Sequence, residues 1–117
     1  MTQPKQYITR LERTIIRLQD LGYIKNFKIL DPTKEKARLT LSSNEEIVIF
    51  VGDDFYIITY MQIREIWNQT PPPPDYIVYD RWDRDTQAGL AEAKEKGMKV
   101  IKFDEFCKIL EKLTNHK

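Results

Sequence analysis

Four consecutive prolines at residues 71–74 divide the chain into two stretches with different hydrophobic patterns. Each proline fixes φ and lacks a backbone N–H donor, so the run fits neither a helix interior nor a central strand. We therefore expect residues 70–75 to form a stiff extended connector, although such runs can also bind proline-recognition domains. Neither stretch of this 117-residue chain is long enough for a good core of its own, so we predict one domain over residues 1–117.

The first stretch opens with an amphipathic helix, expected over residues 5–22. Apolar residues recur there at three- and four-residue steps, as they do on the buried face of a helix. These residues are Ile8, Leu11, Ile15, Leu18 and Leu21. Gly22 follows where a helix C-terminal glycine is expected.

Three arginines share the other face of this helix. Arg10, Arg13 and Arg17 have the same three- and four-residue spacing. Such a stripe is most often a solvated face, but it is also what a phosphate-contacting surface needs. We keep both interpretations, and the second predicts DNA or RNA as a partner.

Four strands are expected next, over residues 27–30, 37–41, 47–51 and 55–59. The second alternates apolar and polar residues, and the third is continuously apolar, as in a strand covered on both faces. The sequence Gly52-Asp53-Asp54 favours a tight hairpin between the last two. The four strands together predict an antiparallel meander.

The remaining chain predicts alternating helices and strands. Helices are expected over about 60–67 and 86–96 and from a cap at Asp104, and strands over 76–79 and 99–101. Asp83 or Asp85 is the predicted cap of the second helix, and Gly97 its end. A strand–helix–strand unit of this length gives parallel strands. The fold class is therefore α+β or α/β, with one mixed sheet flanked by helices.

Several of these segments carry a resemblance to a known fold. They are residues 18–23 (LQDLGY), 75–79 (DYIVY), 88–97, 100–101 and 104–106 (DEF). In this order they resemble the restriction-endonuclease-like fold, the PD-(D/E)XK superfamily, and its Mrr-type members in particular. The tail is also similar to the end of BRCT domains, but that family's N-terminal strand and glycine pair have no match here.

The nuclease resemblance implies a metal site that this sequence does not complete. The motif needs one acid on a hairpin strand and an acid–x–lysine on the next, to hold a divalent cation and orient water. Glu46 falls near the first position, but Thr59 and Met61 stand where the carboxylate and lysine are needed. The resemblance therefore implies a non-catalytic binding or accessory module, with nucleic acid as a possible ligand and no cofactor.

An acidic loop supplies an alternative with chemistry. Asp80, Asp83 and Asp85 follow the strand at residues 76–79, at the end where parallel sheets bind ligands. Three carboxylates this close can bind Mg²⁺ or act as acid and base, which predicts a small metal- or nucleotide-dependent enzyme. The commoner interpretation is helix capping and surface ion pairing.

A third hypothesis is a protein–protein interaction subunit. Tyr60, Trp67 and Trp82 lie near the rigid connector and could anchor a protein partner or a homodimer.

Charge and cysteine content bound these alternatives. There are 19 basic and 18 acidic residues, but residues 1–40 carry a net charge of +5 and residues 41–85 one of −6. A local basic surface is thus compatible with the near-neutral total. The single cysteine, Cys107, excludes an intramolecular disulfide, and no apolar run is long enough to cross a membrane. We expect a cytoplasmic protein.

Overall fold

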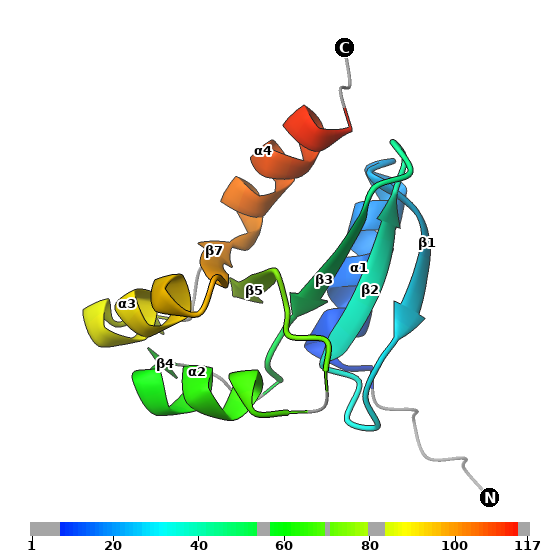
Figure 1. The fold of residues 1–117 in the computed structure, drawn as a ribbon. Coiled ribbons are helices and arrows are strands. Elements are labelled where there is room, and N and C mark those ends of the chain that lie inside the picture. Colours follow the sequence, from blue (N-terminus) through cyan, green and yellow to red (C-terminus); the bar gives the residue numbers. More distant parts are fainter. Residues whose placement is uncertain (1–7, 54–56, 70, 80–83, 115–117) are drawn as a thin grey trace, which may run out of the picture.

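The computed structural model describes residues 8–53, 57–69, 71–79 and 84–114 (Figure 1). Helices and strands alternate after an initial helix and three successive strands. In chain order the elements are α1 (Arg10–Asp20), β1 (Ile24–Ile29), β2 (Lys36–Leu41), β3 (Glu46–Phe50), β4 (Ile57–Ile58), α2 (Tyr60–Trp67), β5 (Tyr76–Tyr79), β6 (Arg84–Asp85), α3 (Gln87–Glu95), β7 (Lys99–Lys102) and α4 (Phe103–Leu113). None of the helices in these segments is long and apolar enough to cross a membrane.

Five strands form one mixed sheet in the order β1-β2-β3-β5-β7. The first three pair antiparallel, and β3, β5 and β7 pair in parallel. The predicted mixed sheet, with antiparallel strands followed by a strand–helix–strand unit, is confirmed. Parallel pairing of β3 with β5 was not predicted, and it makes β3 the strand that joins the two halves.

The predicted fourth strand of the meander is wrong. Residues 57–58 form β4, which pairs in parallel with β6 in a separate two-stranded sheet. The reason is that both edges of β3 are already occupied, by β2 and by β5. Instead of a tight hairpin, the segment after β3 turns toward α1, where the Asp53 carboxylate accepts the backbone N–H of Arg10 at 2.8 Å.

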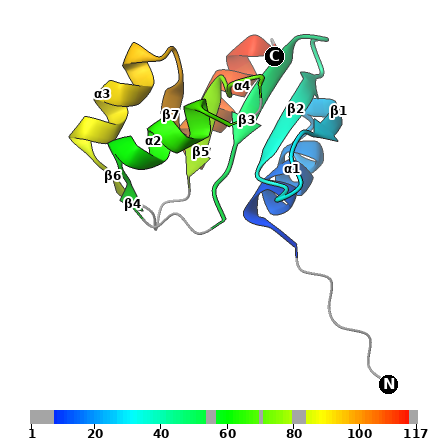
Figure 2. The ribbon, with the colours of Figure 1, turned by 60° about the horizontal axis from the view of Figure 1, so that its bottom comes forward.

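Helices cover both faces of the sheet (Figures 1 and 2). Since side chains alternate along a strand, the odd and even positions of β3 feed two separate cores. One core holds residues of α1 and α4 against the sheet, among them Leu11, Ile49, Val78 and Phe106. The other holds residues of α2 and α3 against the opposite face. Its members are Phe50, Ile63, Ile66, Ile77, Tyr79, Ala93 and Met98.

Helix α1 is shorter than predicted because it is capped at both ends. Thr9 and Glu12 form a capping box at its start. Gly22, at φ +80°, ends it, with the N–H of Tyr23 donating to the carbonyl of Leu18. Gly22 thus has its predicted role.

The predicted apolar stripe of α1 holds only in its middle. Leu11, Ile15 and Leu18 are buried, whereas Ile8 and Leu21 are exposed because they lie outside the helix.

The acidic caps predicted for the last two helices are wrong. Thr86 caps α3, accepting the N–H of Gly89 at 3.0 Å, and Asp85 belongs to β6 instead. Helix α4 follows β7 without a loop, so Lys102 occupies its N-cap position and Asp104 lies in the first turn. An acid in the first turn still favours the helix dipole. Gly97 ends α3 at φ +78°, as predicted.

The proline run joins α2 to β5, as expected of a connector. The peptide bond between Pro71 and Pro72 is cis, so the segment is not extended throughout. After it, Asp75 ties the start of β5 to the middle of β3 and to the start of β7. Its backbone N–H donates to the carbonyl of Val48, its side chain accepts the N–H of Val48, and its carbonyl accepts the N–H of Lys99.

Adjacent isoleucines on α1 test the packing of this helix. Ile15 is 2% exposed and Ile16 is 50% exposed. We expect Ile15→Ala to lower the free energy of unfolding by about 2–5 kcal/mol, because it leaves a cavity under α1. The same change at Ile16 should stay within about 0.5 kcal/mol of the parent. Urea denaturation followed by circular dichroism measures both, and equal effects would contradict the assigned buried face.

Candidate functional site

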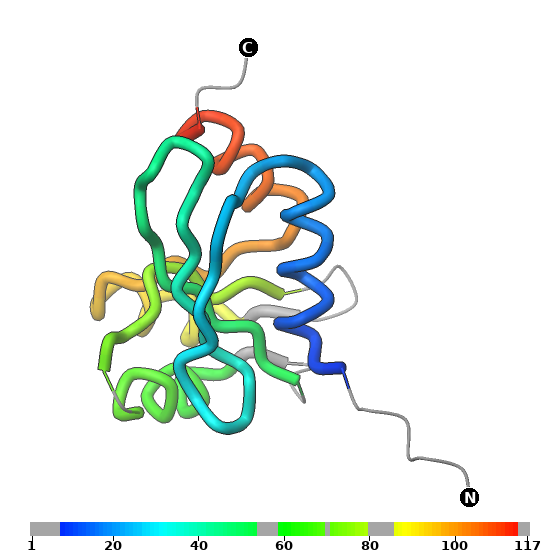
Figure 3. The backbone as a smooth tube through the Cα atoms, turned by 90° about the vertical axis from the view of Figure 1, so that its right-hand side faces the viewer, coloured from blue at the N-terminus to red at the C-terminus, as the bar shows by residue number. Residues whose placement is uncertain are grey.

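A cavity of about 240 Å³ lies at the carboxyl ends of β3 and β5. Helix α1 and the start of α4 flank it, and Figure 3 shows α1 running along the first three strands. Its lining residues are Arg10, Arg13, Thr14, Arg17, Val51, Val78, Tyr79 and Phe103. Ligands of parallel sheets bind outside the carboxyl ends of the strands, so this cavity is the candidate site.

All three arginines predicted as a phosphate-contacting stripe line this cavity. They span eight residues of α1, from Arg10 to Arg17, which is about 10 Å along the helix axis. Arg13 and Arg17 are exposed, and Arg10 is half-buried. From the sequence, the arginine stripe belonged to the nucleic-acid-binding hypothesis and the carboxyl edge of the sheet to the enzyme hypothesis. In the structure both line the same cavity.

Two of the arginines are held by the wall around them. The Nη1 of Arg10 donates to the carbonyl of Gly52 at 3.4 Å. The guanidinium carbon of Arg17 lies 4.0 Å from the centre of the Phe103 ring, a cation–π contact that links α1 to α4.

The N-terminus of α1 is fixed to the loops beside the cavity. The Thr9 hydroxyl donates to the carbonyl of Lys34, at 2.9 Å, in the turn between β1 and β2. Asp53 accepts the N–H of Arg10, and its own N–H donates to the carboxylate of Glu35 at 2.9 Å. These contacts set the position of the arginine helix relative to the strand ends.

The apolar floor of the cavity was missed by sequence reasoning. Val51, Val78, Tyr79 and Phe103 are all buried and come from the ends of β3 and β5 and the start of α4. Tyr79 was recognised only as the last residue of a predicted strand, with no role in a site. The others read as ordinary core positions.

The structure contradicts the hairpin in which the nuclease alignment placed Glu46 opposite Thr59 and Met61. Glu46 is the first residue of β3 and Val51 follows the end of that strand, so the two lie about 16 Å apart. Thr59 caps α2 and Met61 lies within it, so neither faces Glu46 across a hairpin. Glu46 instead lies 4.0 Å from Arg38, as an exposed surface pair.

Most of the acidic loop lies outside the described residues. Asp80, Trp82 and Asp83 lie outside the described residues, and Asp85 is placed only as the last residue of β6. Within the described segments, no group of three or more His, Cys, Asp or Glu side chains is arranged to hold a metal ion.

A second surface lies on the opposite face of the sheet, along α2 and α3. Tyr60 and Trp67, at the two ends of α2, are 43% and 38% exposed. Each ring carries a cation: Arg64 lies 5.2 Å from the Tyr60 ring centre and Lys96 lies 5.4 Å from that of Trp67. Two of the three predicted interaction residues therefore share one helix. They lie on the opposite face of the sheet from Arg10, Arg13 and Arg17 of α1.

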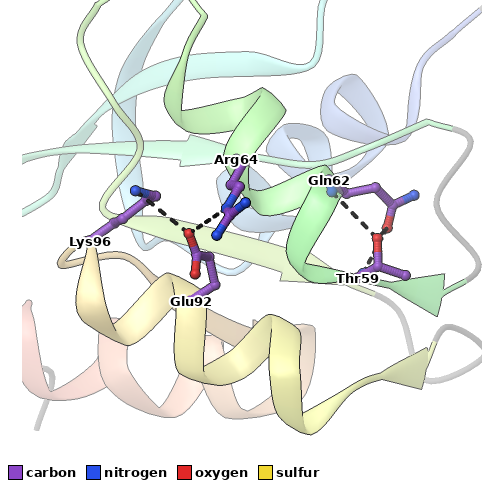
Figure 4. Close-up of polar contacts among 5 residues, drawn as sticks. All are labelled: Thr59, Gln62, Arg64, Glu92 and Lys96. Atoms are coloured by element: carbon purple, nitrogen blue, oxygen red, sulfur yellow. Dashed lines mark hydrogen bonds and ion pairs between the residues drawn. The ribbon is translucent and has the colours of Figure 1, made fainter.

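One carboxylate, that of Glu92, links α2 to α3 (Figure 4). Glu92 accepts a hydrogen bond from Nε of Arg64 at 2.9 Å and lies 3.6 Å from Nζ of Lys96. The hydrogen bond from Arg64 is the main reason that the pKa of Glu92 lies below its usual value. On α2 itself, Thr59 and Gln62 form a capping box.

Two ionisable side chains, the half-buried Cys107 and the buried Lys36, have displaced pKa values. Burial raises the pKa of the Cys107 thiol, against a smaller opposite effect of Arg17, so Cys107 is a packed thiol, as the sequence suggested. Lys36 is 2% exposed on β2, and burial lowers its pKa although Asp31 opposes the shift. A buried lysine was not expected at this position of the strand.

No protein-family model matches the chain, and no curated protein and no solved structure matches it.

The Glu92 link predicts a pH-dependent stability. Its contribution is present above the ordinary glutamate pKa of about 4.3 and is lost as the pH falls through the lower pKa of the folded state. We expect Glu92→Gln to melt at a lower temperature than the parent at pH 7. The difference should shrink as the pH falls and should vanish once the pH lies below the lowered pKa of Glu92 in the folded parent.

Thermal melts followed by circular dichroism across this pH range give the comparison. Glu65→Gln, an exposed carboxylate on α2, is the matched control and should track the parent at every pH. A gap that persisted unchanged at acid pH would contradict the charge-based role of Glu92.

Proposed function

We propose that this protein is a non-catalytic nucleic-acid-binding module, with the α1 arginines contacting phosphates at the carboxyl edge of the sheet. The observation that carries the proposal is the convergence of Arg10, Arg13 and Arg17 on one cavity at that edge. Guanidinium groups bind phosphate oxygens through paired hydrogen bonds, and a phosphate backbone is the polyanion that such a stripe suits.

The charge distribution supports the same function. The first 40 residues carry nine basic and four acidic side chains, and α1 with the β1–β2 hairpin comes from this part. The acidic side chain of Asp53 lies beside Arg10. Its carboxylate accepts a hydrogen bond from the backbone N–H of Arg10, the first residue of α1. It therefore stabilises the helix as well as offsetting part of the positive charge.

The non-catalytic part of the proposal rests on the missing acid–x–lysine pair. None of the strands among the described residues contains an acid–x–lysine sequence, and Glu46 lies at the amino end of β3, away from the cavity. An accessory module on a restriction-endonuclease-like scaffold remains part of the proposal. The parallel β5–α3–β7 unit beside antiparallel strands supports it.

Salt-dependent binding tests the function. We expect fluorescence anisotropy with single-stranded DNA and RNA to show binding that weakens between about 50 and 200 mM salt. Arg13→Ala/Arg17→Ala should weaken binding on every sequence and make the slope of log K against log salt shallower by about 1 to 2. Both side chains are exposed, so the variant should fold.

The control removes the same charge elsewhere. Lys108→Ala/Lys112→Ala takes two exposed cations from α4, outside the cavity lining. It should retain nearly parental affinity. Equal losses in the two variants would argue for non-specific attraction, and no binding at low salt would refute the proposal.

A second candidate function is self-association through α2. The exposed aromatics Tyr60 and Trp67 on one short helix, with exposed Met61 beside them, are the observation that favours it.

Sedimentation at several concentrations tests the second candidate. We expect a concentration-dependent dimer, and Trp67→Ala should shift it toward monomer by at least about tenfold in Kd. Leu90→Ala, an apolar truncation that is also partly exposed but on α3, serves as control. A monomer at every concentration would exclude a homodimer, and nucleic-acid binding should be unaffected by Trp67→Ala because α1 lies on the other face.

A further inference from the structure

We infer that the arginine cavity binds the terminal phosphate of a nucleic-acid strand, a phosphomonoester, in preference to the phosphodiesters within it. This inference rests on the proposed nucleic-acid binding and names the part of the ligand that the cavity takes. Three features of the cavity carry it: size, shape and charge.

The cavity is small. At about 240 Å³ it lies below the roughly 300–1,000 Å³ of sites that enclose a cofactor or drug-sized molecule. It has room for one anionic group with part of its sugar, whereas a duplex could only lie across the rim.

The floor of the cavity is apolar. Val51 and Val78 are 5% and 3% exposed; Val51 directly follows β3 and Val78 lies in the adjacent β5. Phe103, the first residue of α4, also lines the cavity and lies against Arg17 of α1. The apolar side chains of this floor offer no hydrogen-bond donors, so a strand that continued across them would leave its internal phosphates unsatisfied there. This arrangement favours the end of a strand over its interior.

The charge of the wall suits a dianion. A phosphomonoester carries about −1.5 to −2 at neutral pH and offers three terminal oxygens, whereas a phosphodiester carries −1. Arg10, Arg13 and Arg17 present three guanidinium groups within about 10 Å. Beside this apolar floor, the additional charge of the monoester gains more than it would at an open surface, because the local dielectric is lower.

Contacts within the wall prepare two of the arginines for this task. Arg10 is oriented by the carbonyl of Gly52, and Arg17 is held over the Phe103 ring. Less side-chain freedom is then lost on binding. The Thr14 hydroxyl already donates to the carbonyl of Arg10, at 2.8 Å, so the arginines remain the main donors of the lining.

The test compares the ends of one strand. A short single-stranded oligonucleotide with a fluorophore on an internal base is prepared with hydroxyl ends, with a 5′-phosphate and with a 3′-phosphate. We expect one phosphorylated form to bind the full chain at least about tenfold more tightly than the hydroxyl form. A nucleoside monophosphate should compete for the difference.

Substitutions assign the preference to the cavity. Arg17→Ala should reduce the advantage of the phosphorylated form to less than about threefold, and Arg17→Lys should restore it only in part, because lysine lacks the planar pair of donors. Lys108→Ala should leave the advantage unchanged. A thermal melt of each variant establishes that it is folded.

Each negative result of the binding experiment leads to a different conclusion. Equal binding of all three oligonucleotides would overturn the terminal-phosphate inference and leave the proposed function standing. Binding of none of them at low salt would refute the proposed function itself. Tight binding of inorganic phosphate that no oligonucleotide displaces would overturn the inference in favour of a free anion as the ligand.

Discussion

The pairing of β3 on both of its edges is the constraint on which the rest of the structure depends. One edge carries the antiparallel β2 and the other the parallel β5, so this strand joins the N-terminal meander to the strand–helix–strand unit. A strand in this position has both faces covered, and residues 47–51 are apolar for that reason. Because β3 is central, its carboxyl end opens toward α1, α4 and β5 together. The cavity is a direct result of that position.

The local elements were largely predictable from residue pattern. Helix α2 and strand β5 have the bounds expected, and both helix-ending glycines have the positive φ that their positions required. These features depend on short-range periodicity and on backbone sterics, which a single sequence displays directly. The caps at Asp83, Asp85 and Asp104 were wrong because several polar residues stood close together at each start, and only the direction of the preceding strand decides among them.

The site was predictable in pieces and not as a whole. The arginine stripe and the strand edge could each be read from sequence, but their meeting depends on where α1 is fixed. That position comes from contacts over long sequence distances, such as Asp53 with Arg10 and Thr9 with Lys34. The parallel pairing of β3 with β5 was missed for the same reason. A short hairpin after β3 was predicted because neighbouring strands in sequence usually pair. The structure shows that β5 occupies the second edge of β3 instead.

The anchoring of α1 has a consequence for the order in which the molecule assembles. The cavity takes residues from Arg10 at one end of the described chain to Phe103 near the other, with the strand ends between them. Contacts this far apart in sequence close late in folding, because the intervening chain must be ordered first. A partly folded chain would therefore carry its basic helix without a floor beneath it. The capacity to hold a ligand there would appear only as the last long-range contacts form, which makes binding at this cavity a measure of complete folding.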